Sequence, residues 1–444
     1  MKILQEGEKM KITNELFVIP NKENYILYAP LKSAVLEVNA STIPLLQSIK
    51  KGDYSGGNEE TIAKLRAKGI IGEENESLTK CAEEADFKPN SVTLFPTSNC
   101  NLNCSYCYAS AGETHDYMDM DTAKSSIDFI VKNALETGKK DIRVGFHGGG
   151  EPFAHYSLIK ESIEYSQSKA KENNLKLNTS SATNGILNKN QLEWILGNIG
   201  HLNISLDGPK DVQDKQRPLK GEGSSYDKVI ETLDYLNRKK YDYSIRSTIT
   251  NLNVERMTEM IDLFKDICPK KEYHFEPVFE CGRCQKTGLK EPDTKLFIEK
   301  IIEVKEYAGK KGIDIYYSGG KIDSTINKFC GAAGKNFCVT PTGDVTSCFE
   351  VSKKDDPRAK IFFFGKVQDK KIEIYQDRLE TLKSRDVDNM PYCSDCFMKF
   401  NCAGDCLAKV ASQGDMFNPN CNKRCAINRA LGNYEINKLL KNGK

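Results

Sequence analysis

From about residue 91 onward, short apolar runs alternate with amphipathic segments. The runs are rich in β-branched and aromatic residues and predict strands, whereas apolar residues at three- and four-residue spacing predict helices. The predicted strands lie at 92–95, 142–146, 177–182, 202–206, 243–249 and 273–278. The predicted helices lie near 122–135 and 158–172, from 191 onward, and at 227–238 and 254–264. Strands joined by helical crossovers predict an α/β fold with a parallel sheet, curled as a partial (β/α)6 barrel of the TIM type.

The first 80 residues follow a different pattern, in which three short β-like runs precede two helical patterns. The runs lie at 16–19, 25–28 and 34–38, and the helical patterns begin after Ser41-Thr42 and after Asn58. We therefore expect a separate winged-helix-like domain at residues 1–80. A DNA-binding role is disfavoured because this segment has 11 Lys+Arg against 11 Asp+Glu and no basic recognition helix. Capture of a peptide along a strand edge is the favoured role.

Two further boundaries divide the rest of the chain. The acidic and polar stretch before residue 91 predicts a linker at 81–90. The barrel is then expected at 91–315, and a cysteine-rich C-terminal domain at 316–444.

Composition limits the class of protein. The 444 residues include 64 Lys+Arg and 62 Asp+Glu, so a formal net charge of +2 offers no basic excess for nucleic acid or an anionic membrane. No run of 18 or more apolar residues occurs, and the first residues are charged, without the apolar core of a signal peptide. We therefore expect a cytoplasmic protein. Its 16 cysteines then argue for metal or redox chemistry rather than for disulfides.

Three cysteines follow the first predicted strand at C-x-x-x-C-x-x-C spacing. They are Cys100, Cys104 and Cys107. Three thiolates on one loop can hold three irons of a four-iron cluster, which leaves one iron open to a substrate or cofactor. The alternatives are a zinc site completed by a distant residue such as His147, or unrelated buried thiols. With an aromatic residue, Tyr106, before the third cysteine, the motif resembles that of the radical S-adenosylmethionine (radical SAM) superfamily.

The resemblance continues at the ends of the next predicted strands. The segment His147-Gly148-Gly149-Gly150-Glu151-Pro152 is similar to the family's GGE motif. Thr183-Asn184-Gly185 and Ser205-Leu206-Asp207 look like its ribose- and carboxylate-binding ends, and Asp214 with Arg217 matches its D-x-x-R. The resemblance implies that the cofactor is bound by Tyr106, Gly149, Gly150, Glu151, Asn184, Ser205, Asp207 and Arg217. Whether Arg246 also reaches the cofactor is open.

The resemblance also implies a mechanism. The open iron would bind the amino and carboxylate groups of S-adenosylmethionine, and one electron from the cluster would cleave the sulfonium. The resulting 5′-deoxyadenosyl radical would abstract a hydrogen from the substrate. The electron would come from a flavodoxin- or ferredoxin-type reductant.

Nine cysteines between 330 and 425 form a second array. They are Cys330, Cys338, Cys348, Cys393, Cys396, Cys402, Cys406, Cys421 and Cys425. Nine thiols suffice for two four-cysteine sites, and zinc ribbons are the alternative to iron–sulfur clusters. The spacing resembles the SPASM extension of radical SAM enzymes that act on peptides, which implies two auxiliary clusters and three 4Fe-4S clusters in total.

In that family the ligands interleave along the chain. The resemblance assigns Cys330, Cys348 and Cys406 to one auxiliary cluster. It assigns Cys393, Cys396, Cys402 and a final cysteine to the other. The final ligand is either Cys421 or Cys425, of which Cys425 is favoured because it opens the helical pattern at 426–440.

Cys338 is the candidate fourth ligand of the first auxiliary cluster. The segment Pro341-Thr342-Gly343-Asp344 predicts a two-residue hairpin turn. That turn would place Cys338 opposite Ser347 and on the other face from Cys348. The cluster would then have an open iron, to which a substrate thiolate could bind.

Four cysteines remain without a clear role. Cys281-Gly282-Arg283-Cys284 is another C-x-x-C, for which extra metal, redox exchange or two buried thiols are all possible. Cys81 and Cys268 are expected to be structural, and His147 is expected to lie behind the GGE loop.

Together the motifs and the N-terminal domain resemble a radical SAM/SPASM peptide maturase with a PqqD-like leader-recognition domain. Such an enzyme would crosslink a ribosomally made precursor peptide, and a thioether from a cysteine is the expected product, as in sactipeptides and ranthipeptides. A carbon–carbon crosslink is the alternative product. Dehydrogenation of the sulfatase-maturing type is the main rival activity, and the domain at 1–80 argues against it. An iron–sulfur electron carrier is disfavoured because a carrier has no use for a cofactor pocket.

Overall fold

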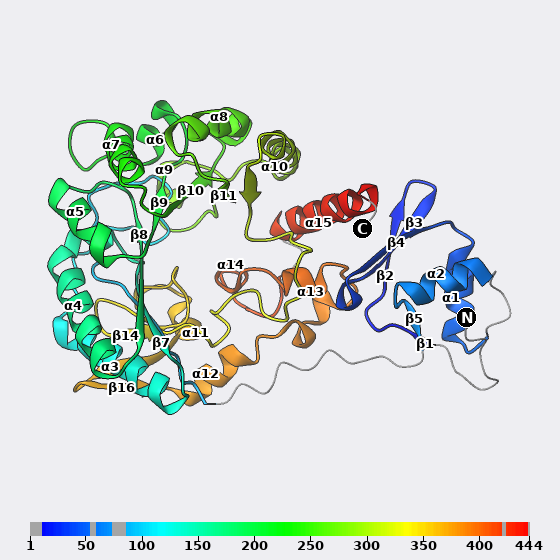
Figure 1. Ribbon diagram of the computed structural model, residues 1–444, viewed down its shortest axis with the longest axis horizontal. Helices are drawn as coiled ribbons and strands as arrows, with labels where there is room; N and C mark the ends of the chain where they lie inside the picture. The colour runs from blue at the N-terminus through cyan, green and yellow to red at the C-terminus, as the bar shows by residue number, and fades with distance from the viewer. Residues whose placement is uncertain (1–10, 54–58, 73–85, 420–422, 443–444) are drawn as a thin grey trace.

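The computed structural model describes residues 11–53, 59–72, 86–419 and 423–442 (Figure 1). Cys81 and Cys421 lie outside the described residues, and so do the predictions made for these two cysteines. Among the helices of the described residues, none is both long and apolar enough to span a membrane.

An open, eleven-stranded sheet forms the centre of the molecule, in the order β12-β11-β10-β9-β8-β7-β6-β13-β14-β15-β16. Strands β6 to β12 are parallel, and they lie at Ser91–Leu94, Asp141–Phe146, Lys176–Thr183, His201–Ser205, Tyr243–Ile249, Glu272–Pro277 and Asp314–Tyr316. The six predicted strands and the α/β class with a large, mostly parallel sheet are confirmed. Strand β12 was not predicted, because only Ile315 of its three residues is buried.

Helices connect the parallel strands and cover the outer side of the sheet (Figure 1). They are α3 (Met120–Glu136), α4 (Tyr156–Glu172), α5 (Lys189–Asn198), α6 (Lys210–Gln216), α7 (Ser225–Arg238), α8 (Met257–Ile267), α9 (Cys284–Thr287) and α10 (Thr294–Gly309). Side chains cap the starts of α3, α5, α7 and α10; Asp119 accepts from the backbone of Thr122, and Asn188 forms a capping box with Gln191. The apolar core lies between these helices and the strands.

The sheet continues into the C-terminal part of the chain. Strand β13 (Cys338–Val339) pairs in parallel with β6, and β14 (Asp344–Thr346), β15 (Phe363–Gln368) and β16 (Lys371–Ile374) follow as antiparallel strands. The helices of this part are α11 (Ala359–Phe362), α12 (Gln376–Lys383), α13 (Lys399–Cys402), α14 (Leu407–Ala411) and the long α15 (Lys423–Lys441), and cysteines lie within α13 and α15. The hairpin predicted around residues 341–344 corresponds to β13 and β14, whereas β15 and β16 were not predicted.

The predicted hairpin register at Cys338 is wrong by one residue. Cys338 pairs with Thr346, and not with Ser347, because three residues, 341–343, separate the hydrogen-bonded Thr340 and Asp344. Gly343 adopts the left-handed conformation at φ +78°, which a three-residue hairpin loop favours. The Thr340 hydroxyl accepts from the backbone N–H of Asp344 at 3.1 Å and fixes this loop.

The N-terminal domain contains the elements that its pattern predicts. Strands β2 (Phe17–Asn21), β3 (Asn24–Ala29) and β4 (Ala34–Val38) form an antiparallel sheet, and α1 (Thr42–Lys50) and α2 (Glu59–Ala67) follow. A short pair, β1 (Lys11–Ile12) with β5 (Ile71–Gly72), joins its two ends. Short 3-10 helices elsewhere lie at Pro30–Lys32, Pro152–His155, Val254–Arg256, Val387–Asn389 and Pro391–Cys393.

This domain packs on the C-terminal helix rather than on the parallel strands (Figure 1). Ile26, Tyr28 and Val35 from its sheet are buried together with Ile436 of α15. The Tyr28 hydroxyl donates to the side-chain oxygen of Asn401 at 2.7 Å. The sheet therefore has one face in its own core and the other on the C-terminal part.

Candidate functional site

The three cysteines after β6 lie on one loop, residues 96–112, which we call the cysteine loop. Burial raises the pKa of Cys104; the nearby Arg217 lowers it, and Cys107 and Cys100 raise it further, so the three thiols share one neighbourhood. Backbone N–H groups donate to two of the sulfurs: Leu102 to Cys100 at 3.4 Å and Ala111 to Cys107 at 3.3 Å. Such donors stabilise thiolates and cluster sulfurs.

Among the described residues, no group of three or more His, Cys, Asp or Glu side chains could hold a single metal ion. A four-iron cluster has a different requirement, because each thiolate binds its own iron at a different corner. Three thiols with backbone N–H donors on one loop fit a cluster with one iron free of protein ligands.

The glycines after β7 allow their loop to lie against the cysteine loop. A Cβ atom on Gly150 would lie 2.0 Å from the carbonyl oxygen of Asn99, and Gly149 has a positive φ of 61°. The backbone N–H of Glu151 donates to the same Asn99 oxygen at 2.8 Å. Only glycine fits such a close approach of two backbones.

Glu151 joins this loop to the end of β8. Its buried carboxylate accepts from the Thr183 hydroxyl at 2.8 Å and from the backbone of Asn184 at 2.7 Å. Burial raises the pKa of Glu151 to about 7, although these donors oppose the shift. Beside it, a cavity of about 510 Å³ is lined by Asn101 and Ile186 among others.

Asn184 links the end of β8 to the cysteine loop. Its side-chain nitrogen donates to the Asn101 side chain at 2.6 Å and lies 3.8 Å from the sulfur of Cys100. The structure thus brings together Cys100, Glu151 and Asn184, which are far apart in the sequence.

Asp207 is fully buried and is surrounded by donors from its own chain. Its carboxylate accepts from the Tyr106 hydroxyl at 2.5 Å, from Arg217 Nε at 2.9 Å and from the side chain of Gln216 at 2.9 Å. The Arg217 guanidinium lies over the Tyr106 ring, 5.2 Å from its centroid. Asp207 therefore orients Tyr106 and Arg217, and it can act on a ligand through them.

Two other predicted residues lie apart from this network. Asp214 accepts from the side chain of Ser225 at 3.1 Å and the backbone of Tyr226 at 2.9 Å, so it supports the start of α7. Ser205 is in register with Arg246 on the next strand, and Arg246 is in register with His274. The Arg246 side chain makes no hydrogen bond or ion pair within the described part of the chain, and its charge acts on His147 and Glu276.

A second segment, residues 281–287, holds the cysteine loop from the other side. Arg283 donates from its guanidinium to the carbonyl oxygens of Cys104 at 2.9 Å and Ala111 at 2.7 Å, and from its backbone to Cys107 O at 3.0 Å. A Cβ atom on Gly282 would lie 2.4 Å from the Tyr108 oxygen. This C-x-x-C motif predicted possible roles for its two cysteines, but the glycine and the arginine between them are the residues that contact the site.

The C-terminal cysteines form two groups. In the first, burial raises the pKa of Cys348 well above its usual range, and Glu350, Cys406 and Cys330 raise it further. Cys338 is not among these neighbours; burial raises its pKa, and its thiol contacts the Thr93 hydroxyl across the β13–β6 pair.

In the second group, burial raises the pKa of Cys402, and Asp405, Cys425 and Cys396 raise it further. The pKa of Cys393 is raised to about 11 by burial and then by Cys396. Cys425 thus lies with the other three, which is the arrangement that favours it as the final ligand. The side-chain nitrogen of Asn428, one turn further along α15, donates to the Cys402 sulfur at 3.2 Å.

The chain is similar in sequence to known proteins. Residues 94–267, which include the cysteine loop and Arg217, match the model of the Radical SAM superfamily. The cysteine-type anaerobic sulfatase-maturating enzyme of Clostridium novyi (strain NT) is 25% identical over 266 residues, covering 57% of this chain and 69% of that protein. Its namesake from Clostridium perfringens (strain ATCC 13124) is 22% identical over 343 residues, covering 72% and 89%. The chain is a radical SAM enzyme.

Solved structures agree on the fold. The structure of anSMEcpe with bound AdoMet has a TM-score of 0.62 at 19% identity, covering 79% of this chain and 98% of that chain. Streptococcus suis SuiB bound to precursor peptide SuiA has a TM-score of 0.54 at 13% identity, covering 92% and 98%. The radical SAM enzyme described here is therefore similar in fold to both, and the match to SuiB covers more of this chain.

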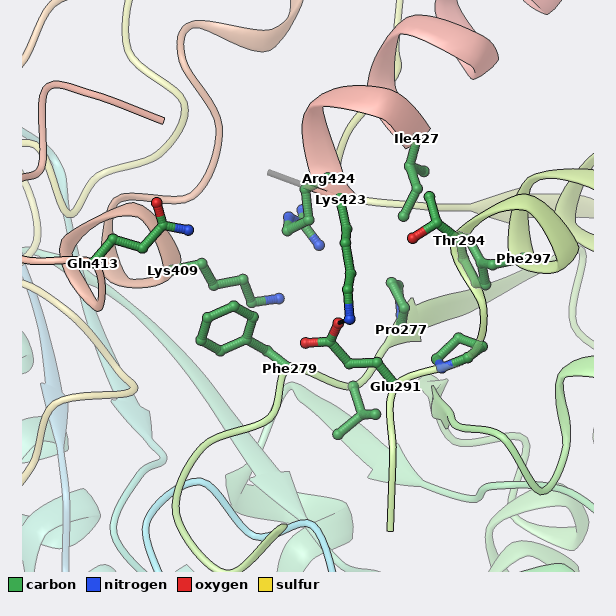
Figure 2. Close-up of a pocket in the computed structure, with 12 residues that line it drawn as sticks. Pro277, Phe279, Glu291, Thr294, Phe297, Lys409, Gln413, Lys423, Arg424 and Ile427 are labelled. Carbon is green, nitrogen blue, oxygen red and sulfur yellow. Dashed lines mark hydrogen bonds and ion pairs between the residues drawn. The ribbon is translucent and has the colours of Figure 1, made fainter. Parts of the chain in front are cut away.

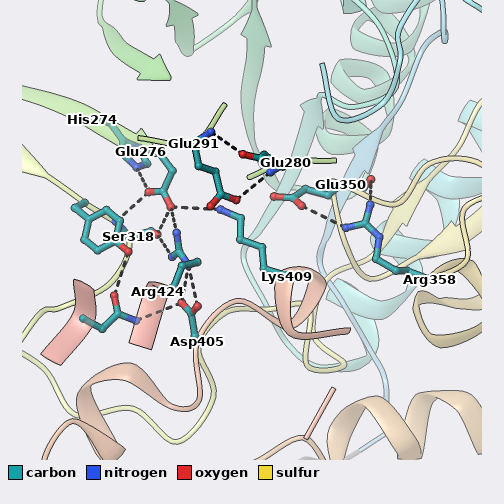
Figure 3. A network of polar contacts seen from close by, with 12 residues as sticks. His274, Glu276, Glu280, Glu291, Ser318, Glu350, Arg358, Asp405, Lys409 and Arg424 are labelled. Carbon is teal, nitrogen blue, oxygen red and sulfur yellow. Dashed lines mark hydrogen bonds and ion pairs between the residues drawn. The ribbon is translucent and has the colours of Figure 1, made fainter. Parts of the chain in front are cut away.

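A buried network of charges joins the radical SAM domain to the C-terminal part (Figure 3). Glu276, at the end of β11, accepts from Arg424 Nη1 at 2.8 Å, and Arg424 Nε donates to Asp405 at 2.8 Å. Lys409 lies 3.6 Å from Glu276. Burial opposes ionisation of Glu276, but Arg424, His274 and Lys409 lower its pKa well below the usual range.

A cavity of about 300 Å³ opens beside this network (Figure 2). Its walls come from the segment after β11, from α10, from α14 and from the start of α15, and they include Phe279, Phe297, Lys409 and Lys423. Lys423 forms an ion pair with Glu291 at 2.9 Å across the cavity. This cavity lies between the radical SAM domain and the C-terminal cysteines.

Proposed function

We propose that this radical SAM enzyme is a peptide maturase that oxidatively crosslinks a ribosomally made precursor peptide. The observation that carries the proposal is the group Cys330, Cys348 and Cys406, a second thiol set that faces the cysteine loop. Tyr108, next to Cys107, donates from its hydroxyl to the carbonyl oxygen of Phe349, next to Cys348, at 3.4 Å. A substrate bound between the two sets would therefore be within reach of both.

The first site fits an iron–sulfur cluster and S-adenosylmethionine, with Cys100, Cys104 and Cys107 as the cluster ligands. When bound, these groups supply a 5′-deoxyadenosyl radical that abstracts a substrate hydrogen. Arg217 presents a fork of donors suited to the cofactor carboxylate, and Asp207 holds that fork together with Tyr106. Backbone groups of Gly149 and Gly150, fixed by Glu151, and the side chains of Asn184 and Ser205 complete the proposed cofactor contacts.

Two further four-iron clusters are proposed in the C-terminal part. Cys393, Cys396, Cys402 and Cys425 would hold one of them. Cys330, Cys348 and Cys406 would hold the other, which leaves one iron without a cysteine, because Cys338 contacts Thr93 instead. A substrate thiolate could bind that iron, so we favour a thioether as the product over a carbon–carbon crosslink.

The N-terminal domain is proposed to bind a leader segment of the precursor along an edge of the β2–β3–β4 sheet. An edge strand offers unpaired backbone groups to an extended peptide. The docking of this sheet on α15 would bring the leader close to the C-terminal cysteines. A flavodoxin- or ferredoxin-type reductant is proposed as the electron source, and a cytoplasmic location as the setting.

The proposal is tested by anaerobic assay of the reconstituted enzyme with the candidate precursor. Wild type should release 5′-deoxyadenosine, and the peptide should lose two hydrogens per crosslink with loss of a free thiol. Cys100→Ala should abolish 5′-deoxyadenosine release, because the first cluster loses a ligand. Release retained in this variant would contradict the assignment of the first site.

A second candidate is a sulfatase-maturing type of dehydrogenation, which the similarity to the two Clostridium enzymes favours. Removal of two hydrogens from a serine or cysteine side chain leaves a carbonyl-type group that reacts with hydrazides. A crosslinked peptide gives no such reaction. Hydrazide labelling of the product therefore separates the two activities.

A further inference from the structure

We infer that the carboxylate of Glu350 is the fourth ligand of the auxiliary cluster proposed at Cys330, Cys348 and Cys406 when no substrate thiolate is bound. The inference rests on the proposed function, because it assumes a cluster at these three cysteines. It assigns the iron position that no cysteine fills.

The first observation is an unpaired oxygen. Glu350 Oε2 is buried and has no hydrogen-bond partner within the described part of the chain. A buried carboxylate oxygen without a donor is costly, so such an atom points to a ligand.

Arg358 forms an ion pair with this oxygen but donates no hydrogen bond to it (Figure 3). Arg358 Nη1 lies 3.6 Å from Glu350 Oε2, beyond a normal hydrogen bond. Arg358 instead donates from Nε and Nη2 to the carboxylate of Asp356, at 3.0 and 2.8 Å. The Glu350 oxygen therefore stays available while the arginine is held by another acid.

The second observation is the position of Glu350 among the thiols. It follows Cys348 by two residues, and its backbone N–H donates to the Cys348 sulfur. Its charge acts on the thiols of Cys348, Cys406 and Cys330. One carboxylate thus lies close to all three proposed ligands.

Other candidates for the fourth position fit less well. Cys338 contacts Thr93, and no thiol is among the groups that perturb it. Cys281 also has Glu350 as a neighbour, but it belongs to the 281–287 segment that contacts the cysteine loop and not to the C-terminal array.

A carboxylate suits a ligand position on iron from which it must dissociate when the substrate binds. A carboxylate oxygen is a harder donor than a thiolate and binds cluster iron less well. Exchange of a cysteine ligand for another ligand raises the reduction potential of the cluster, as histidine does in Rieske centres. A substrate thiolate can then displace the carboxylate, one anion for another, with no change in the charge or oxidation state of the cluster.

The test uses the full-length, reconstituted enzyme grown with [13C]glutamate. Wild type should show 13C hyperfine coupling in the electron-nuclear double resonance spectrum of the reduced auxiliary cluster, and Glu350→Gln should remove it. Glu350→Cys should restore a four-thiolate site with a lower midpoint potential. Asp356→Asn, which alters the arginine but not the ligand, should keep the coupling.

Several outcomes would overturn the inference. Absence of coupling in wild type, or an unchanged spectrum and potential in Glu350→Gln, would exclude the ligand role. So would a change of the cluster signal in Cys281→Ser, which would assign the position to that thiol. Iron near four per chain in wild type, instead of about twelve for three clusters, would contradict the auxiliary clusters of the proposed function themselves.

Discussion

A single side chain that donates a hydrogen bond to a ligand sulfur can change the reduction potential of a proposed cluster. Asn428 is such a side chain, because it is buried on α15 and donates to the Cys402 sulfur at 3.2 Å. Its oxygen accepts from the Tyr317 hydroxyl at 3.1 Å, so the orientation of the amide is fixed. A donor to a ligand sulfur favours the more negative, reduced cluster.

Asn428→Leu should therefore lower the midpoint potential of the cluster proposed at Cys393, Cys396, Cys402 and Cys425. Loss of a buried hydrogen bond should also lower the free energy of unfolding by about 1–3 kcal/mol. The potential is measured by redox titration followed by electron paramagnetic resonance. Asn437→Leu on the same helix, where the amide contacts only Asn433 at the surface, is the control. Equal potentials in the two variants would contradict the role of Asn428.

At the scale of elements, the short segment after β11 explains how the cysteine loop is held. Four carbonyl oxygens of that loop accept from this segment, because Thr287 donates from its hydroxyl to Ser105 O at 2.8 Å in addition to the three bonds from Arg283. A loop that carries three cluster ligands on irregular backbone needs such support, since it has no ladder of its own.

Gly282→Ala and Arg283→Gln should each reduce the iron bound at the first site and slow substrate-free cleavage of S-adenosylmethionine. The alanine would force a Cβ atom to within 2.5 Å of the Cys107 oxygen at a backbone φ of +57°, and the glutamine cannot reach two carbonyls at once. Arg283→Lys should recover part of the iron. Cys284→Ser, whose thiol donates to Leu289 O at 3.0 Å and not to the cysteine loop, is the matched control. Iron and sulfide analysis with anaerobic spectroscopy measures the cluster occupancy of the first site. Full occupancy in Gly282→Ala would contradict the role of residues 281–287 in holding the cysteine loop.

The parallel part of the fold could be predicted from the sequence, because each strand and helix there has its own apolar period. The motifs at the strand ends could be located for the same reason. The roles of Glu151 and Asp207 could not, because their donors come from distant strands and loops. The contribution of Arg283 was hidden by the cysteines around it, and the three-residue loop before Asp344 depended on side-chain hydrogen bonds that spacing does not reveal.

At the scale of the whole molecule, the radical SAM domain and the C-terminal part are joined in two ways. Strand β13 extends the parallel sheet through its pairing with β6, so the boundary predicted at residues 315 and 316 does not separate two sheets. The charge network at Glu276 makes the second connection on the opposite side (Figure 3). Both connections hold the C-terminal cysteines in a fixed position relative to the cysteine loop.

Arg424 is the centre of the second connection, and its removal should be costly. Arg424→Met would leave the buried carboxylates of Glu276 and Asp405 without their main cation, because Lys409 contacts only one of them, at 3.6 Å from Glu276. Breaking a buried ion pair from one side costs about 3–5 kcal/mol. The preceding residue offers a matched control, because Lys423→Met removes an ion pair with Glu291 in which the lysine side chain is 62% exposed. An exposed pair contributes at most about 1 kcal/mol. Anaerobic denaturant unfolding of the two variants measures the difference, and equal stabilities would show that the network does not hold the two parts together.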